Sequence, residues 1–436
     1  MTDKCDGSPD VHLNMNVRGL RVSATIGINE RCDQLAKEDR PVYRLGLGQS
    51  PFPVPESVVL ELQRNAFQKS YLPVKGLPAL REAIAEHHQR TFGIKCSPDN
   101  VLVGPGSKEL MFLLQMVYDG EVVIPTPAWV SYAPQAKIIG RQVKLVPTQP
   151  ETGWRLTPDQ LEEVCREDPG RPRILILNYP SNPTGGTYSS DELRDLAKVA
   201  SRCRVVLLSD EIYAKLHHDG DHCSVVPFYP EGTIFSGGLS KWCGAGGWRL
   251  GLFVIPECMR WLLNAMAAVA SETFTSTSAP IQYAAIQAFA GGNDIERYIR
   301  SCRRVLKPLG LRLVALLEES GIRVLHPAGG FYLFPDFSPL VEGLRRIGID
   351  TSEALCERLL EETGVAILPG SDFGRPPHEL TARLAYVDFD GAEALKAVDN
   401  LPEDQPAGDA FVDRYCRRTV QAIRDLCAWV VDNTQG

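Results

Sequence analysis

From about residue 100 onward, short apolar runs alternate with longer segments of helical period, and this alternation constrains the fold more than any other feature. The apolar runs cover residues 101–103, 121–124, 143–146, 173–178, 204–209 and 250–255. They are apolar along most of their length, which is typical of strands that helices cover on both faces. Helical periods lie between them, for example at residues 108–118 and 190–200. The pattern predicts an α/β fold with a mainly parallel sheet.

After residue 290 the pattern changes to that of a smaller unit. A charged helical stretch at 295–320 comes first. The segments that follow are predicted strands at 322–325, 330–334 and 382–387, a predicted helix at 352–363 and one more amphipathic helix at 409–433. Near the other end, the first twenty residues look like a loose arm, and the Gly- and Pro-rich residues 46–55 predict a loop.

These changes of pattern predict two main domains with a cleft between them. The expected parts are an N-terminal arm with part of the small domain at 1–45, a large domain at 46–295, a small α+β domain at 296–400 and an additional C-terminal helix at 401–436.

Charge and composition exclude several classes of protein. The formal net charge of −8 argues against a nucleic-acid or anionic-membrane partner, which would need a basic face. The polar N-terminus contains no signal-like apolar segment, and no run of 18 apolar residues predicts a membrane span. The 12 scattered cysteines include no C-x-x-C pair, so we expect reduced thiols in a cytoplasmic protein. The His- and Asp-rich residues 217–223 predict an exposed turn between short strands, and we expect no metal site.

Ligands of such sheets bind beyond the carboxyl ends of the strands, so the residues that follow each run are the candidates for function. After residues 101–103 come Gly106, Ser107 and Lys108 at a predicted helix start, where free backbone N–H groups could face an anion. A plain tight turn is the alternative. Trp129 follows the next run, and its face could cover a flat ring.

The later runs end in polar residues of different kinds. Asn182 lies in a turn with two prolines, and Asp210 ends a buried run, where an acid needs a cationic partner. A Gly-rich segment then carries Lys241 and Arg249. A lysine in such a cleft can form a Schiff base, and a carboxylate can keep a pyridine nitrogen protonated. These residue types together are what pyridoxal 5′-phosphate (PLP) requires.

The chain resembles a known family through an ordered set of motifs. They are YLPVKGLPALR at 71–81, GPGSKEL, PAWVSY, NYPSNPTGG, SDEIY, LSKWCGAGGWRLG, GGFYLF and ILPGSDFG, within residues 20–390. This set is similar to that of the fold-type I PLP enzymes, specifically the class I and II aminotransferases, and most similar to the Iβ-like aspartate aminotransferases. The resemblance implies a large PLP-binding domain with a seven-stranded, mainly parallel sheet, and a smaller α+β domain.

The resemblance also implies roles for the cofactor site. Lys241 would be the Schiff-base lysine and proton-transfer base, Asp210 would pair with the pyridine nitrogen, and Tyr213 and Asn182 would meet the 3-oxygen. Trp129 would stack on the ring. The implied phosphate ligands are Gly106, Ser107, Lys108, Ser240, Arg249 and, from a neighbouring subunit of a homodimer, Tyr71. Many relatives have a phosphate-binding serine where this chain has Gly238, so we expect one phosphate contact to be weaker.

For the substrate, the resemblance implies that Arg383 binds the α-carboxylate, helped by Asn182 and the backbone of Gly48. Lys108 matches a lysine that recognises the distal carboxylate of aspartate or glutamate in the similar subgroup, although a solvated lysine is the alternative. The expected reaction is a ping-pong transfer of an amino group from an L-amino acid to a 2-oxo acid.

Other functions remain open from the sequence. The same cofactor residues would serve aromatic or broad-specificity transamination, a β-lyase, a cyclopropane-forming synthase or a decarboxylase. A more distant alternative is the effector-binding part of a transcription regulator. Such proteins carry an N-terminal DNA-binding domain, for which the segment before the resemblance is short, and the acidic net charge also argues against it.

Overall fold

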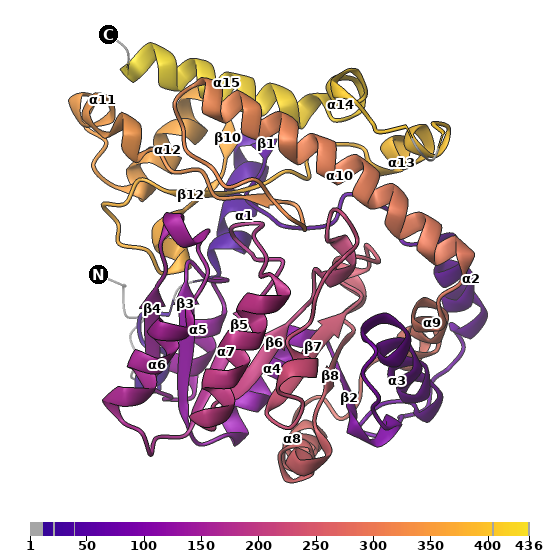
Figure 1. Cartoon of the computed structure of the whole chain (residues 1–436). Helices are drawn as coiled ribbons and strands as arrows, with labels where there is room; N and C mark the ends of the chain where they lie inside the picture. The colour runs from indigo at the N-terminus through magenta and orange to yellow at the C-terminus, as the bar shows by residue number, and fades with distance from the viewer. Residues whose placement is uncertain (1–11, 21, 39, 403–404, 435–436) are drawn as a thin grey trace, which may run out of the picture.

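The computed structural model describes residues 12–20, 22–38, 40–402 and 405–434, and a seven-stranded sheet forms its centre (Figure 1). The strand order is β2-β8-β7-β6-β5-β3-β4. The strands are β2 (Val101–Gly104), β3 (Glu121–Thr126), β4 (Val143–Pro147), β5 (Arg173–Asn178), β6 (Val206–Asp210), β7 (Thr233–Gly238) and β8 (Gly251–Val254). Strand β8 is antiparallel to both of its neighbours, and the other pairs are parallel. The predicted fold class is confirmed.

Helices cover both faces of this sheet, which explains why its strands are apolar on both sides. The covering helices are α4 (Ser107–Val117), α5 (Tyr132–Ile138), α6 (Pro158–Glu167), α7 (Ser190–Arg202) and α8 (Arg260–Thr273). Ile174 and Ile176 of β5 pack in the core with α4, α5 and α8. The alternate residues Leu175 and Leu177 pack in the core with α6 and α7. Because successive strand residues point to opposite faces, both faces need apolar side chains.

Strand β7 was not among the predicted strands, because its sequence TIFSGG ends in two glycines and contains few large apolar residues. The structure explains Gly238. A Cβ atom at this position would lie 2.7 Å from the carbonyl oxygen of Leu250 on the neighbouring chain segment. A serine at position 238 would require the backbone beside β8 to shift, so glycine suits the close packing found here.

A second part of the structure contains two small sheets and the long helix α10 (Asn293–Glu319). One sheet joins β9 (Tyr332–Leu333), β11 (Leu368–Pro369) and β12 (Ala382–Ala385) in antiparallel pairs. The other pairs β1 (Tyr43–Arg44) with β10 (Val365–Ala366) in parallel, so the N-terminal segment lies beside a late part of the chain (Figure 1). The remaining helices here are α1 (Ala24–Lys37), α11 (Val341–Arg346), α12 (Ser352–Thr363) and α13 (Gly391–Asp399).

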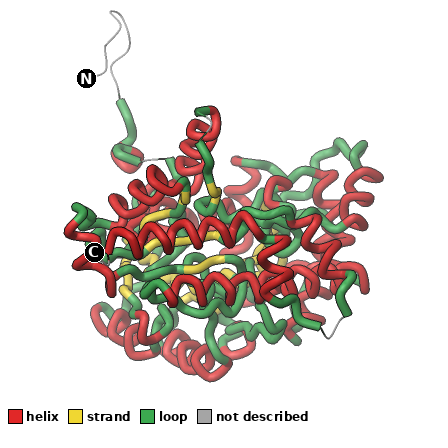
Figure 2. The backbone as a smooth tube through the Cα atoms, turned by 90° about the horizontal axis from the view of Figure 1, so that it is seen from above, coloured by secondary structure: helices red, strands yellow, loops and turns green. Residues whose placement is uncertain are grey.

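Two predictions for this part are wrong. The predicted strand at 322–325 is only an isolated bridge between Arg323 and Asp336. The predicted single helix at 409–433 is two helices, α14 (Asp409–Tyr415) and α15 (Arg417–Thr434), separated at Cys416. The break allows both helices to contact α10, and α15 runs along it (Figures 1 and 2). Its buried face repeats at helical spacing, with Val420, Ile423 and Val430.

The predicted N-terminal arm falls partly on residues 1–11, which lie outside the described residues. Residues Met15–Val17 form a short 3-10 helix that contacts α5. The predicted loop at residues 46–55 is confirmed and leads into α2 (Glu56–Asn65). Within the described ranges, no helix combines the length and apolar character needed to cross a membrane.

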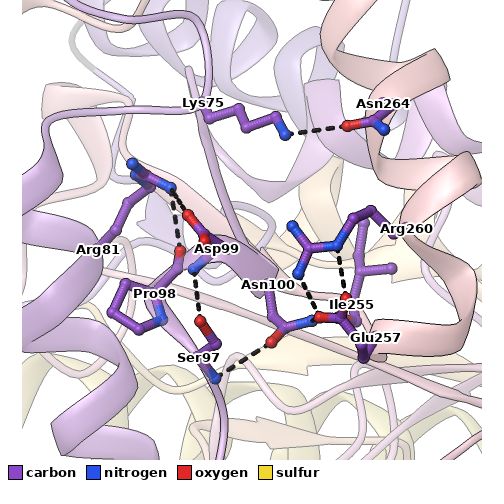
Figure 3. Close-up of polar contacts among 10 residues, drawn as sticks. All are labelled: Lys75, Arg81, Ser97, Pro98, Asp99, Asn100, Ile255, Glu257, Arg260 and Asn264. Atoms are coloured by element: carbon purple, nitrogen blue, oxygen red, sulfur yellow. Dashed lines mark hydrogen bonds and ion pairs between the residues drawn. The ribbon is translucent and has the colours of Figure 1, made fainter.

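Polar contacts tie the edge of the large sheet to the helices around it, α3 (Pro78–Phe92) and α8 (Figure 3). The side chain of Asn100, directly before β2, donates to the Ile255 carbonyl at 2.9 Å and accepts from the Ser97 N–H at 3.1 Å. Arg81 of α3 donates to the Pro98 carbonyl at 3.1 Å. Helix α9 (Ala279–Ala290) packs against α3. These contacts hold the start of β2 in register with the end of β8, and therefore also position the loop that follows β2.

Candidate active site

A cavity of about 290 Å³ lies where the loops after the parallel strands meet the loop before α2. Most of the predicted site residues line it: Gly48, Ser107, Lys108, Trp129, Asn182, Asp210, Tyr213, Ser240, Lys241 and Arg249. The position agrees with the rule that ligands bind beyond the carboxyl ends of parallel strands. Gly106 and Arg383 are not in its lining but contact residues that are. Tyr71 lies outside it.

Lys241 enters the cavity from the Gly-rich loop between β7 and β8. Its Nζ donates a hydrogen bond to the carbonyl oxygen of Gly48 at 2.7 Å. The same Nζ lies 5.7 Å from the ring centre of Tyr213 and 5.9 Å from that of Phe331. The amine is therefore held between the end of the large sheet and the loop before α2.

Asp210 is the last residue of β6, and it is buried with 3% of its surface exposed. Oδ2 accepts a hydrogen bond from the Tyr132 hydroxyl at 2.5 Å, and Oδ1 accepts a longer one from the Ser236 hydroxyl at 3.4 Å. Burial raises the pKa of Asp210 to about 6, although Tyr132, the Ile212 N–H and Lys241 all act to lower it. A cationic ligand beside this carboxyl group would favour its ionised form.

The start of α4 forms a cradle for an anion. Gly106 is the N-cap with a φ of 92°, and a Cβ atom there would collide with the guanidinium of Arg249. A Cβ atom at Gly251 would collide with the backbone nitrogen of Ser107. Arg249 donates to the carbonyl of Gly246 at 2.9 Å, which holds its guanidinium beside the helix start. A helix N-terminus next to an arginine is suited to a phosphate group.

Arg383, on β12, is almost completely buried with 1% exposed. Its guanidinium donates to the carbonyl of Gly46 and, at 3.4 Å, to Oδ1 of Asn182. Its Nε has no hydrogen-bond partner among the described residues. Burial lowers the pKa of this guanidinium. A buried cation with an unused N–H is suited to bind a carboxylate from a ligand.

Three side chains that the sequence predictions missed also belong to this region. Tyr332 on β9 shares a hydrogen bond of 2.8 Å with Tyr213, hydroxyl to hydroxyl. Asn178 donates to the Asp210 carbonyl at 2.9 Å and accepts from the Asn182 N–H at 2.8 Å. Tyr132 holds Asp210. All three residues lie inside the motifs on which the family resemblance rests, so the sequence could have marked them as candidates. Their hydrogen bonds could not be predicted, because they depend on the tertiary structure.

Lys108 and Trp129 lie together on one side of the cavity. The Lys108 Nζ is 5.3 Å from the centre of the Trp129 ring. Burial, and to a lesser extent Arg249, lowers the pKa of Lys108. Lys108 is therefore not a fully solvated lysine on the first helical turn, which was the alternative from the sequence.

The histidine-rich segment differs from its prediction. Asp219 and Gly220 are exposed, as expected for a turn, but 3-10 helices at Ala214–Leu216 and Val226–Phe228 flank the segment instead of strands. His218 is buried between the carbonyls of Pro327 and Gly330, at 3.0 and 3.3 Å. In the described part of the chain, no three His, Cys, Asp or Glu side chains gather in a way that could hold a metal ion.

The donor set of the cavity fits PLP. It combines an amine at Lys241, a buried carboxyl at Asp210, an indole ring at Trp129 and an anion cradle at Gly106 and Arg249. An amine, an acid and an anion cradle are the groups that the aldehyde, the ring nitrogen and the phosphate of PLP need.

Comparisons with known proteins agree with this chemistry. The profile of the family described as Aminotransferase class I and II matches residues 40–398. An aspartate aminotransferase of Bacillus sp. (strain YM-2) is 32% identical over 402 residues, which cover 89% of this chain and 98% of that protein. The aspartate/prephenate aminotransferase of Thermus thermophilus is 33% identical over 379 residues, covering 86% and 94%.

The solved structure of the Thermus thermophilus aspartate aminotransferase with maleate superposes with a TM-score of 0.81 at 29% identity, covering 95% of this chain and 100% of that chain. The shared fold, the family match over most of the sequence and the two relatives above 30% identity lead to one conclusion. The chain belongs to the class I and II aminotransferases and is a PLP-dependent transaminase.

Proposed function

We propose that this aminotransferase takes its amino group from a dicarboxylic amino acid, aspartate or glutamate, and passes it to a 2-oxo acid. The observation that carries the proposal is the half-buried Lys108 in the wall of the cavity, which adds a second cation to that of Arg383. Two cations suit a substrate with two carboxylates. The maleate in the structure of the Thermus thermophilus relative is itself a four-carbon dicarboxylate, which supports the same choice.

Lys241 is the proposed covalent anchor and proton carrier. When bound, PLP supplies an electron sink that makes the α-proton of an amino acid acidic. Lys241 Nζ would hold the cofactor and, when freed by the incoming amino group, carry the proton to and from the substrate α-carbon. Its present hydrogen bond to the Gly48 carbonyl keeps the amine directed into the cavity.

The other residues would orient and hold the cofactor. Asp210 would keep a proton on the ring nitrogen, Asn182 and Tyr213 would donate to the 3-oxygen, and the face of Trp129 would cover the ring. The proposed phosphate ligands are the helix start at Gly106, Ser107 and Lys108, together with Ser240 and Arg249. Gly238 adds no side chain to this set, in agreement with its close packing against Leu250.

Arg383 would bind the substrate α-carboxylate through its guanidinium, with help from Asn182 and the backbone of Gly48. The buried position of this guanidinium supports the role, because its unused Nε gains a partner when a carboxylate enters. Exclusion of water around Arg383 strengthens the ion pair.

We also propose a homodimer in which Tyr71 reaches the phosphate of the neighbouring subunit. Tyr71 is 89% exposed and Phe67 is 74% exposed, which leaves an aromatic surface for a second copy to cover. Sedimentation equilibrium should give a particle of two chains, and a monomer with full activity would contradict the homodimer proposal.

The compartment that we propose is the reducing cytoplasm. The free thiols of the described cysteines suit it.

The test of the substrate proposal is Lys108→Ala, with steady-state kinetics on aspartate, glutamate, alanine and phenylalanine. Loss of one charge-assisted hydrogen bond costs about 1.5–3 kcal/mol, so KM for aspartate and glutamate should rise at least about tenfold. KM for alanine and phenylalanine should change by less than about threefold, since they lack the distal carboxylate.

Lys137→Ala is the matched control, because Lys137 is an exposed lysine on the neighbouring helix α5. It should leave all four KM values unchanged. An equal rise for all four substrates in the Lys108 variant would point to lost phosphate binding and would overturn the dicarboxylate proposal.

A further inference from the structure

Tyr132 is the nearest side-chain partner of Asp210, and none of the proposed contacts with cofactor or substrate involves it. It is the first residue of α5 and is buried with 2% exposed. Its ring packs in the apolar core beneath the sheet together with residues of α4 and β6, such as Leu110 and Leu208. Only its hydroxyl meets a polar group, Oδ2 of Asp210 at 2.5 Å.

The two carboxylate oxygens of Asp210 are held unequally. Oδ2 receives the short hydrogen bond from Tyr132, whereas the side-chain hydroxyl that reaches Oδ1, that of Ser236, is 3.4 Å away, and the Ile212 N–H also donates to the carboxylate. A carboxylate oxygen that accepts one strong hydrogen bond fixes the rotation of the whole group. Loss of the Tyr132 hydroxyl would therefore remove the shortest side-chain hydrogen bond that orients the carboxylate.

Helix α5 is itself fixed to the cradle side of the cavity. Gln135, one turn after Tyr132, donates to the backbone carbonyl of Lys108 at 2.7 Å and accepts from Gln115 at 3.1 Å. The Tyr132 ring also stands at 83° to that of Trp129, with ring centres 5.2 Å apart. One short helix therefore sets the relative positions of Asp210, Trp129 and the start of α4.

We propose that Tyr132 is a positioning residue that aims the Asp210 carboxylate at the cofactor ring nitrogen and helps to keep it ionised. This inference rests on the proposed role of Asp210. The electrostatics agree with the geometry. The Tyr132 hydrogen bond acts to lower the pKa of Asp210, while burial and, next, the nearby acid raise the pKa of Tyr132 well above its ordinary value, so the phenol remains the donor.

The test compares holoenzymes of wild type, Tyr132→Phe and Asp210→Asn in three measurements. These are the PLP dissociation constant after cofactor removal, the pH midpoint of the absorbance of the bound cofactor, and kcat with KM. Phenylalanine keeps the packed ring and removes only the hydroxyl. We expect Tyr132→Phe to weaken PLP binding and lower kcat by about tenfold or more, the value of one hydrogen bond to a charged group. The absorbance midpoint should shift, and KM should change less than about threefold.

Tyr188→Phe is the matched control. Tyr188 is also buried, and its hydroxyl accepts one hydrogen bond, from the Leu156 N–H at 3.0 Å, but it does not line the cavity. It should lower stability without changing PLP affinity or the absorbance midpoint. Tyr132→His, which keeps a ring with a donor, should recover part of the kcat lost in Tyr132→Phe.

The possible results distinguish a failure of the Tyr132 inference from a failure of the proposed role of Asp210. If Tyr132→Phe matches Tyr188→Phe in PLP affinity and absorbance midpoint while Asp210→Asn does not, Tyr132 has only a packing role and the inference is overturned. If Asp210→Asn is also without effect, the proposed role of Asp210 itself fails. Should the apoenzyme of Tyr132→Phe not refold, the absorbance titration of protein purified with its cofactor still decides between these results.

Discussion

Asp210 and Glu211 are neighbours at the end of β6, yet they serve two different regions of the molecule. Asp210 lines the cavity and accepts a side-chain hydrogen bond of 2.5 Å from Tyr132 and one of 3.4 Å from Ser236. Glu211 faces away, into a closed network in which its side chain is 0% exposed. Ser209 and Ser224 each donate to Oε1 at 2.7 Å, and His222 donates to Oε2 at 2.6 Å. Burial of an acid alone does not identify a site, whereas a buried acid that also lines a cavity is a candidate for function.

The Glu211 network also supports the site from behind. The Tyr179 hydroxyl lies 3.2 Å from Glu211 Oε1 and accepts the Val225 N–H at 2.9 Å. Tyr179 belongs to the loop that carries Asn182, so the network holds this loop against the end of β6. We therefore expect changes at Asp210 to affect catalysis first and changes at Glu211 to affect stability first.

The largest expected effect is that of Asp210→Asn on kcat. Loss of the acid that holds the ring proton should reduce kcat by about 10²- to 10⁴-fold, the usual range for a group that controls proton transfer. The apoprotein should be no less stable than wild type at pH 7. The pKa of Asp210 is raised to about 6, so its favourable contribution to folding is present below about pH 4 and is lost as the pH rises through 6.

Steady-state kinetics and thermal unfolding of the apoprotein check this prediction together. A large fall in unfolding temperature with kcat almost unchanged would make Asp210 a structural acid like its neighbour, and would remove the contrast between the two regions.

Glu211→Gln should have the next largest effect, on stability. An amide cannot accept all four of the surrounding donors, so the free energy of unfolding should fall by about 2–3 kcal/mol. We expect kcat to fall less than about tenfold, because Glu211 does not line the cavity. Urea unfolding of the holoenzyme measures the change. Glu357→Gln, an exposed position on α12, is the control and should stay within about 0.5 kcal/mol of wild type. If Glu211→Gln had the stability of the wild type but a kcat as low as that of Asp210→Asn, Glu211 would serve catalysis and not stability.

The smallest effect concerns pH. The titratable groups that interact with Asp210 are Tyr132 from α5, Tyr213 after β6 and Lys241 after β7. Since the pKa of Asp210 is about 6 in the structure, the carboxyl becomes neutral below this pH and loses its attraction for a cationic ring. PLP affinity of the apoenzyme should therefore fall by up to about tenfold per pH unit below 6. Fluorescence titrations from pH 5 to 8 should show this step in wild type and in Glu211→Gln, but not in Asp210→Asn. Parallel curves for the wild type and the Asp210 variant would contradict the prediction.

The sequence predicted the large sheet well because its strands are covered on both faces. Continuous apolar runs predicted β2 to β6 and β8, whereas β7 was missed because close packing requires glycine at position 238. In the small sheets, β9 and β12 lie within predicted strands, whereas the two-residue strands Tyr43–Arg44, Val365–Ala366 and Leu368–Pro369 are too short to produce a pattern. The break between α14 and α15 at Cys416 depends on packing against α10, so the local sequence pattern does not predict it. The division at residues 45, 295 and 400 stays a prediction.

The site was predictable to the extent that its residues directly follow strands. Asp210 and Asn182 could be found in this way, and the structure brings both to the cavity. Arg383 could come only from the family resemblance, because it arrives from a distant strand and touches Asn182 across 201 positions of sequence. Tyr132 and Tyr332 were missed because each contributes through one hydrogen bond, Tyr132 to Asp210 and Tyr332 with Tyr213. These hydrogen bonds form only in the folded chain.

The central claim is that the amine of Lys241 holds the cofactor in the cavity that contains Asp210. Borohydride reduction of the holoenzyme, followed by proteolysis and mass spectrometry, tests it directly, because reduction makes a lysine-bound cofactor permanent. The account predicts one modified peptide, labelled at Lys241, and no label in a Lys241→Ala protein. A label on another lysine, such as Lys108 in the cavity wall, or a Lys241→Ala protein that turns over at the wild-type rate, would contradict it.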